Sequence, residues 1–261
     1  DFGLPEPENV SIEAGDVILS GWYFDNPADG GCGVLFMHGF TGTRYQALYW
    51  APMFSERGCD ILAYDHRGHG ESTPAYYSYG YYEKQDALTA LRWFQQRAGL
   101  AESQVGVGGV SYGAGTALQL APMIPDAAFI LADSSYRSLE AIVAARAEER
   151  LGRLSKLLLP GALGVAGLRG KFNAADVSPE NAIAGAQMPV LLIHSRTDDF
   201  TPATHSEAIY ANSDKSRTVL HVNEWGSPHA GDIATDYDAY KQQFDAFMAT
   251  YAPDFGLAPA P

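Results

Sequence analysis

Ser111 lies in the stretch VGVGGVSYGAG, residues 105–115, which contains five glycines. The pattern G-x-S-x-G, from Gly109 to Gly113, is typical of a serine on a very tight turn between a strand and a helix. Such a turn strains the backbone of the serine, and side chains two residues to either side would collide, so glycine is needed there. An apolar run precedes Ser111 and a helical pattern follows it. We therefore predict that Ser111 is a nucleophile rather than part of an ordinary turn.

The same glycines match neither of the common phosphate-binding motifs. A P-loop needs a lysine and a hydroxyl directly after its second glycine, and no lysine lies between Lys84 and Lys156. The dinucleotide-binding pattern G-x-G-x-x-G fails because Ser111 stands where the third glycine belongs, after Gly106 and Gly108. Both failures favour the nucleophile.

A serine hydroxyl needs a base that takes its proton and a carboxylate that orients the base. Asp198 follows the apolar run PVLLIHS, and His229 follows the run TVLHV in the loop GSPHAGD. The order serine, aspartate, histidine is the one found in α/β-hydrolases. We predict Ser111, Asp198 and His229 as the catalytic residues, with Asp199 as the alternative acid.

The chain has seven histidines, so the other six must also be considered as the catalytic base. His221 falls inside a predicted strand, where a core position is expected, and His205 falls in a predicted helix, where exposure to solvent is expected. Three further histidines end strands or flank a glycine turn, and structural contacts are expected for them: His66, His69 and His194. Only His229 lies in a loop after the last predicted strand.

The oxyanion of a tetrahedral intermediate needs two backbone N–H groups. One is expected from Tyr112, directly after the nucleophile, and the other from Phe40 in the loop that follows GVLFMHG. Phe40, Tyr112 and Trp225 are also the predicted pocket residues, because they neighbour the proposed catalytic groups. The run YYSYGYY, residues 76–82, either lines an aromatic-ester site or packs at the surface, and the second is favoured.

Short apolar runs alternate with helical patterns along the chain, which predicts a parallel sheet covered on both faces. The first two runs, ENVSIEAG and VILSGWYF, have no helix between them and predict an antiparallel hairpin at one edge. In the helical pattern over residues 83–98, Ala87, Leu91, Phe94 and Ala98 share one face. We expect a single domain over residues 1–261, whose residues 253–261 form a loose tail.

Residues 136–187, here called the insertion, contain helical patterns at 139–151 and near 154–168 but no convincing strand. We predict a helical lid over the ligand end of the sheet. Residues 137–171 hold seven Lys or Arg against three Glu, in a chain whose net charge is −14. Such a basic, partly apolar segment could admit anionic aryl esters or make weak contact with a lipid surface, although packing on the core is favoured.

The remaining composition excludes several classes of function. A net charge of −14 argues against nucleic acid as a partner. No stretch of about 18 apolar residues could span a membrane, and no histidine spacing suggests a metal site. If the runs CGVLFMH and CDILAYD are neighbouring parallel strands, Cys32 and Cys59 form either a disulfide, which would imply export, or two buried thiols.

Through HGFTG, YDHRGHGES, GVSYGAG, LLIHSRTDDFTP and SPHAG, in that order, the chain resembles the α/β-hydrolase superfamily over nearly its whole length. It is most similar to the Bem46 and S33-like esterase groups, through ENVSI…GWYF, SYGYYEKQDALTAL and FNAADVSPENAI. The resemblance implies an α/β-hydrolase fold: an eight-stranded, mostly parallel sheet with helices on both faces and a helical lid insertion. It also implies a triad of Ser111, Asp198 and His229.

The resemblance further implies Phe40 and Tyr112 as oxyanion donors and a serine carboxylesterase that needs no cofactor or metal. Its substrate would be a small-molecule ester; a lipase, thioesterase or amidase would use the same triad, and a non-catalytic binding module is the remaining alternative. Relatives often carry an N-terminal signal or anchor, so an exported or membrane-anchored protein is expected, and otherwise a cytoplasmic one. One departure is Ser195, which stands where the family usually has glycine before the acid.

Overall fold

Eight strands alternate with helices along residues 3–152 and 155–257, the part of the chain that the computed structural model describes. The number of strands is the eight that the resemblance implies. The strands are β1 (Glu8–Ala14), β2 (Val17–Phe24), β3 (Gly33–Met37), β4 (Asp60–Tyr64), β5 (Val105–Val110), β6 (Phe129–Asp133), β7 (Val190–Ser195) and β8 (Thr218–Asn223).

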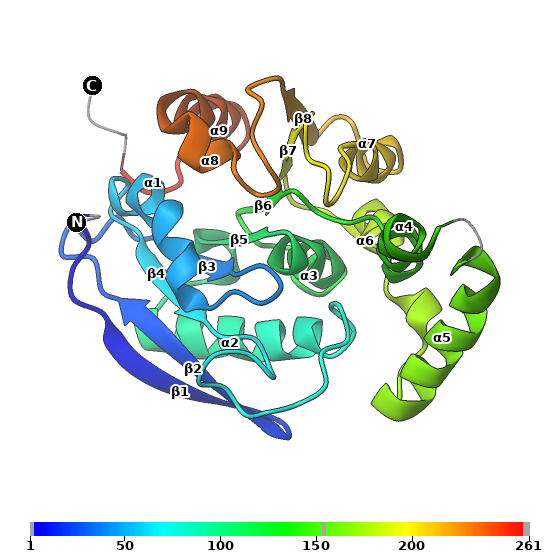
Figure 1. Cartoon of the computed structure of the whole chain (residues 1–261). Helices are drawn as coiled ribbons and strands as arrows, with labels where there is room; N and C mark the ends of the chain where they lie inside the picture. Colours follow the sequence, from blue (N-terminus) through cyan, green and yellow to red (C-terminus); the bar gives the residue numbers. More distant parts are fainter. Residues whose placement is uncertain (1–2, 153–154, 258–261) are drawn as a thin grey trace.

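The strands form one twisted sheet in the order β1-β2-β4-β3-β5-β6-β7-β8 (Figure 1). β2 pairs antiparallel with both β1 and β4, and the other strands pair in parallel. The predicted α/β architecture, with an eight-stranded, mostly parallel sheet and an antiparallel hairpin at one edge, is therefore confirmed.

Helices cover both faces of the sheet. α2, α3 and α7 contribute side chains to one buried hydrophobic cluster, and α1, α8 and α9 contribute to a second. The helices are α1 (Ala51–Ser55), α2 (Glu83–Ala98), α3 (Tyr112–Leu120), α4 (Leu139–Leu151), α5 (Ser155–Gly170), α6 (Pro179–Ala182), α7 (Thr204–Ala211), α8 (Asp232–Thr235) and α9 (Tyr237–Tyr251).

The central strands are mostly apolar because both of their faces are buried, and β3 has no polar side chain. In β3, Leu35 and Met37 join the first cluster, whereas Val34 and Phe36 join the second. Successive side chains of a strand point to opposite faces, so a continuous apolar run fills both cores. This arrangement leaves the loops after the carboxyl ends of the strands free to carry polar side chains.

Cys32 and Cys59 form a disulfide. They precede two neighbouring parallel strands, β3 and β4, in which Gly33 pairs with Asp60. The pairing brings the two Cα atoms to 4.6 Å, within the range that a disulfide spans. Of the two possibilities that the sequence leaves open, the structure shows the bridge.

The insertion is helical between β6 and β7, and no strand occurs among its described residues. α4 and α5 form at the two predicted helical patterns, although Leu154, the predicted start of the second, lies outside the described residues. In Figure 1 α5 stands away from the sheet, beyond α4. The predicted contact of the insertion with a lipid surface stays a prediction.

The prediction of a loose tail over residues 253–261 is wrong for residues 253–257. Phe255 is buried, and its ring lies 5.1 Å from that of Phe129. The N–H of Leu257 donates to the carbonyl of Arg57 at 2.8 Å. The buried ring of Phe255 and this hydrogen bond hold the segment against the core, which composition does not reveal.

None of the described helices combines the length and the hydropathy that a membrane crossing requires.

Candidate active site

Ser111 lies at the junction of β5 and α3 in a strained conformation. Its φ of 53° and ψ of −109° fall in a region that residues other than glycine rarely adopt. The N–H of Ser111 donates to the carbonyl of Asp133 at 2.7 Å, which holds the turn against the end of β6. A Cβ atom at Gly109 would come within 2.5 Å of the carbonyl carbon of Gly113. Glycine is therefore needed where the strand folds back on the helix.

The loop after β3 packs directly against this turn. A Cβ atom at Gly113 would overlap the backbone carbonyls of Met37 and His38, and one at Gly39 would lie 3.5 Å from the Cβ of Ser111. The backbone that precedes Phe40 is therefore adjacent to the nucleophile. Tyr112 is the first residue of α3, so its N–H is at the helix N-terminus, where the helix dipole favours negative charge.

His38 orients the peptide that joins Gly39 to Phe40. Its Nε2 accepts from the N–H of His66 at 2.9 Å, so its Nδ1 carries the proton and donates to the carbonyl of Gly39 at 2.7 Å. Burial lowers the pKa of His38 to about 4, which keeps the ring neutral. In a trans peptide the N–H of Phe40 points opposite to the Gly39 carbonyl, so His38 fixes its direction.

The structure brings Ser111, His229 and Asp198 together from three separate loops. The Nε2 atom of His229 lies 2.8 Å from the Oγ of Ser111, and its Nδ1 lies 2.6 Å from Oδ2 of Asp198. With the proton on Nδ1, His229 donates to the carboxylate and accepts from the serine hydroxyl. This geometry allows His229 to take a proton from Ser111.

Asp198 is buried and held in place by several donors. Its Oδ1 accepts from the N–H groups of Phe200 at 2.9 Å and Thr201 at 2.8 Å. Burial raises the pKa of the Asp198 carboxyl, but the hydrogen bonds from His194 and His229 outweigh that effect and hold the pKa below its usual range. The carboxylate therefore stays ionised at neutral pH.

The structure distinguishes Asp198 from its predicted rival. Asp199 is exposed, whereas Asp198 points inward onto His229. The serine at position 195 does not prevent this geometry. Its hydroxyl donates to the carbonyl of Ser227 at 2.7 Å and so ties the acid loop to the loop that carries His229.

His194 has a larger part in the site than the sequence indicates. Its Nδ1 accepts from the Ser206 hydroxyl at 2.7 Å, which leaves the proton on Nε2. Nε2 lies 2.5 Å from the carbonyl of Thr201 and 3.1 Å from Oδ2 of Asp198. His194 thus donates to Oδ2 of Asp198, the same oxygen that His229 contacts. The spacing of four residues between His194 and Asp198 is the only signal in the sequence.

The expectation that His205 faces solvent is wrong. Its side chain is buried, and its Nδ1 accepts from the N–H of Arg137 at 3.1 Å, at the start of the insertion. Burial also lowers the pKa of His205 to about 4. His66 and His69 make structural contacts as expected, with ring centroids 5.0 and 5.7 Å from that of Tyr112.

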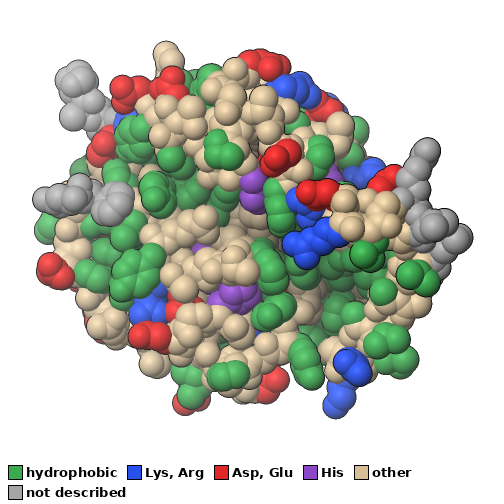
Figure 2. Space-filling model, viewed as in Figure 1, with side chains coloured by type: hydrophobic (Ala, Val, Ile, Leu, Met, Phe, Trp, Pro, Cys, Tyr) green, Lys and Arg blue, Asp and Glu red, His purple; other side chains and the backbone are tan. Residues whose placement is uncertain are grey.

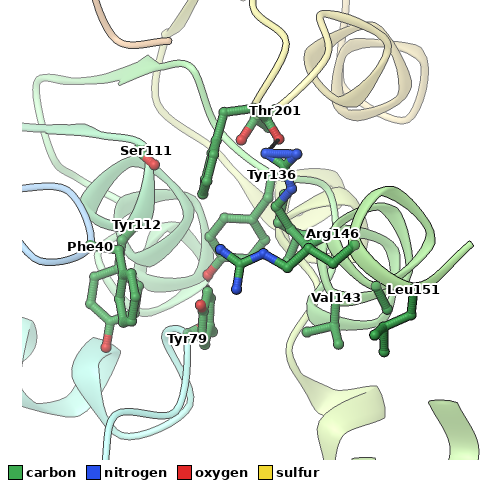
Figure 3. A pocket seen from close by; sticks show the side chains of 13 residues that line it. Phe40, Tyr79, Ser111, Tyr112, Tyr136, Val143, Arg146, Leu151 and Thr201 are labelled. Atoms are coloured by element: carbon green, nitrogen blue, oxygen red, sulfur yellow. Dashed lines mark hydrogen bonds between the residues drawn. The ribbon is translucent and has the colours of Figure 1, made fainter. Parts of the chain in front are cut away.

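A cavity of about 330 Å³ opens beside Ser111 (Figure 3). The nucleophile side contributes Phe40 and Tyr112, while α4 contributes a stripe of side chains on the opposite side, among them Val143 and Arg146. The full set of lining residues is Phe40, Tyr79, Ser111, Tyr112, Tyr136, Ile142, Val143, Arg146, Ala147, Arg150, Leu151, Phe200 and Thr201.

Two of the three predicted pocket residues, Phe40 and Tyr112, line this cavity, and Trp225 does not. Trp225 packs instead against the second hydrophobic cluster, because the loop between β8 and His229 turns its ring toward the core. The tyrosine run contributes one lining residue, Tyr79, whose ring stacks on Phe40 at 5.6 Å. Alternation alone does not tell which tyrosine of that run points inward.

Comparisons with known proteins identify the family. A family model described as "alpha/beta hydrolase fold" matches residues 34–154. The chain is 31% identical to the uncharacterised protein YqkD of Bacillus subtilis over 217 residues, which cover 82% of this chain and 70% of YqkD. It is 22% identical to the uncharacterised protein YfhR of Escherichia coli K12, covering 94% of this chain and 82% of YfhR.

Two kinds of solved structure share the fold. The esterase Pf2001 of Pyrococcus furiosus superimposes with a TM-score of 0.76 at 23% identity, covering 96% of this chain and 94% of the esterase. The acylaminoacyl peptidase of Pyrococcus horikoshii superimposes with a TM-score of 0.74 at 17% identity, covering 99% of this chain and 43% of the peptidase. At these identities the likeness shows the fold alone.

Proposed function

Because the chain belongs to the alpha/beta hydrolase fold family, we propose that it is a serine carboxylesterase with Ser111 as its nucleophile. Membership of this family supports a hydrolase, and one observation supports the more specific proposal of a serine carboxylesterase. Ser111 stands on a strained turn, and an unbroken chain of hydrogen bonds joins its hydroxyl through His229 to the ionised Asp198. Ser111 also lines the cavity, so an ester bound there can reach its hydroxyl.

In the proposed reaction His229 takes the proton of Ser111 as its Oγ attacks the ester carbonyl. The N–H groups of Phe40 and Tyr112 donate to the oxyanion that forms. His229 then protonates the leaving alcohol, and a water molecule repeats the sequence on the acyl-enzyme. Asp198 stays ionised throughout and stabilises the imidazolium. No step uses a metal or an organic cofactor.

The cavity favours esters with apolar or aromatic parts. Its walls are mostly hydrophobic and include the rings of Phe40, Tyr79, Tyr112 and Tyr136. Its volume lies at the lower end of the range for small-molecule sites, so a short or medium acyl group fits it best. The insertion supplies the wall opposite Ser111 through α4, which supports its proposed role as a lid.

The proposal is tested with p-nitrophenyl esters from acetate to palmitate, together with a thioester and an anilide of the preferred acid. We expect turnover to be greatest for short or medium esters. Ser111→Ala and His229→Ala should each lower kcat by at least ~10³-fold, as in other triads. His221→Ala is the matched control, because His221 lies in β8 and should leave most activity.

Wild-type rates in Ser111→Ala would refute the mechanism. A fluorophosphonate that fails to label Ser111 would show a binding module instead of an enzyme. Preference for palmitate, the thioester or the anilide would replace the carboxylesterase with a lipase, a thioesterase or an amidase.

The disulfide between Cys32 and Cys59 supports the further proposal that the protein works in an oxidising compartment outside the cytoplasm. Thiol alkylation of the protein taken directly from its native cells, followed by mass measurement, tests this idea. Two alkylated cysteines would contradict it.

A further inference from the structure

The cavity beside Ser111 has a charge opposite to that of the protein. The chain holds 31 Asp and Glu against 17 Lys and Arg. Yet among the described residues that line the cavity none is acidic, and two are arginines, Arg146 and Arg150. Figure 2 shows Lys or Arg side chains at the rim of the central hollow, next to α4.

Both arginines belong to one face of α4. They are four residues apart, so they lie on the same side of the helix as Val143 and Ala147, which also line the cavity. The two cations and the apolar wall are therefore parts of a single stripe that faces the proposed active site.

Arg146 is anchored close to the proposed catalytic groups. Its guanidinium lies 4.5 Å from the ring centroid of Phe200 and donates to the Phe200 carbonyl at 3.3 Å. The Phe200 ring in turn lies 4.9 Å from the ring of His229. Phe200 thus connects the cation to the base, and the side chain of Arg146 is only 22% exposed.

The carboxylate that pairs with Arg146 can be replaced by a ligand. Arg146 pairs with Glu149 on its own helix, and the Glu149 side chain is 61% exposed and does not line the cavity. Solvated pairs of this kind contribute little to stability. A carboxylate that enters the cavity can therefore take the place of Glu149 without leaving a buried charge unpaired.

We propose, on the basis of the esterase function above, that the site selects esters whose acyl part ends in a carboxylate. The ester carbonyl lies at Ser111, the apolar middle contacts Tyr79 and Tyr136, and the carboxylate binds Arg146 and Arg150. Arginine suits this role because its planar guanidinium pairs with both oxygens of a carboxylate. The two arginines determine specificity and take no part in bond cleavage.

A matched pair of substrates tests the proposal: mono-p-nitrophenyl adipate and its neutral terminal amide, which has the same shape. The rate with Ser111→Ala is subtracted as the background. We expect the wild-type kcat/KM to be at least ~10-fold higher for the adipate, mainly through a lower KM, because charge-assisted pairing discriminates by about this factor. The preference should weaken from about 20 to 500 mM salt.

Arg146→Gln and Arg150→Gln should each reduce the adipate preference, the ratio of kcat/KM for the adipate to that for the amide, by ~5-fold or more. Arg146→Lys should keep part of the adipate preference that Arg146→Gln loses. Glu149→Gln should increase the adipate preference, because the competing carboxylate is removed. Arg137→Gln is the matched control, since Arg137 lies in the insertion, pairs with Glu180 and does not line the cavity.

Turnover of the neutral amide shows that each variant is folded and active. Equal wild-type rates for the two substrates, or an adipate preference that both glutamine variants retain, would overturn the inference and leave the esterase function standing. Failure to cleave either substrate, together with no fluorophosphonate adduct, would overturn the esterase function itself.

Discussion

The region around Ser111 and the outer part of the insertion are built in opposite ways. All nine residues of α3 are buried, and Cβ atoms at Gly109 and Gly113 would overlap backbone atoms. In the insertion, α5 does not line the cavity and exposes Leu158, Val165 and Leu168, and a Cβ atom at Gly161 or Gly164 would meet nothing within 4 Å. The same residue types are therefore constrained around Ser111 and free in α5.

We interpret this difference as a division of roles: the region around Ser111 positions the groups that transfer protons, and the insertion selects the substrate. Proton transfer needs atoms held within a few tenths of an ångström, and a densely packed wall provides that precision. Segments with few buried contacts open at lower free energy, so we expect the insertion to adapt more readily than the region around Ser111 to a bound substrate. Matched substitutions in the region around Ser111 and in α5 test this interpretation.

The largest contrast is expected between two leucines. Leu118 of α3 is fully buried in the first cluster, so Leu118→Ala should lower the free energy of unfolding by about 2–5 kcal/mol. Leu168 of α5 is 83% exposed, and Leu168→Ala should change it by less than ~0.5 kcal/mol. Urea denaturation of both variants measures the difference. Equal losses would show that α5 packs as tightly as α3.

A smaller contrast is expected between two glycines. Gly113→Ala places a methyl group against the carbonyls of Met37 and His38, which should cost about 1–3 kcal/mol and displace the loop that carries Phe40. We expect kcat/KM to fall by ~100-fold, because small misplacements are costly in catalysis. Gly161→Ala meets open space within a helix and should stabilise the protein by up to about 1 kcal/mol.

Ester hydrolysis and thermal unfolding are measured on both glycine variants. An active Gly113→Ala, or an inactive Gly161→Ala, would reverse the assignment of the region around Ser111 as the constrained one.

The smallest effect on activity is expected for His194, which donates to the Asp198 carboxylate. In His194→Ala the Asp198 carboxylate loses one donor but keeps His229 and two backbone N–H groups, so we expect kcat to fall by ~10-fold. His194→Gln, which retains an N–H donor, should recover part of the activity. Unchanged kinetics in His194→Ala would show that His194 only fills space.

The same variant has a signature in its pH dependence. The pKa of Asp198 is lower in the folded protein than its ordinary value of 3.8, so its ionised form stabilises the fold above about pH 4, and this contribution is lost as the pH falls further. Part of it comes from His194. The difference in Tm between wild type and His194→Ala should therefore be largest at neutral pH and shrink below about pH 4.

Much of the fold could be predicted because it follows from local patterns. Apolar runs of five or six residues specify the central strands, which are buried on both faces, and the turn at Ser111 requires glycines that stand out in the sequence. The order of Ser111, Asp198 and His229 follows from where each residue comes relative to a strand end. The placement among the Bem46 and S33-like groups stays a prediction.

Other features were missed because they depend on contacts between distant segments. Tyr79 lies in the loop before α2 and Trp225 in the loop after β8, and only the packed structure shows that the first lines the cavity and the second packs against the core. The ring of Phe255 packs against that of Phe129, although more than a hundred residues separate them in the sequence.

The sequence by itself determined the alternation of strands and helices, the strained turn and the three residues that meet there, since each rests on short-range sterics and periodicity. Only the tertiary structure decided that Asp198 rather than Asp199 faces His229, that His194 supports it, and that Arg146 and Arg150 share a cavity with Ser111. Side-chain direction in loops and the packing of one helix on another are set by the whole fold, because neighbours distant in sequence supply the contacts that select them.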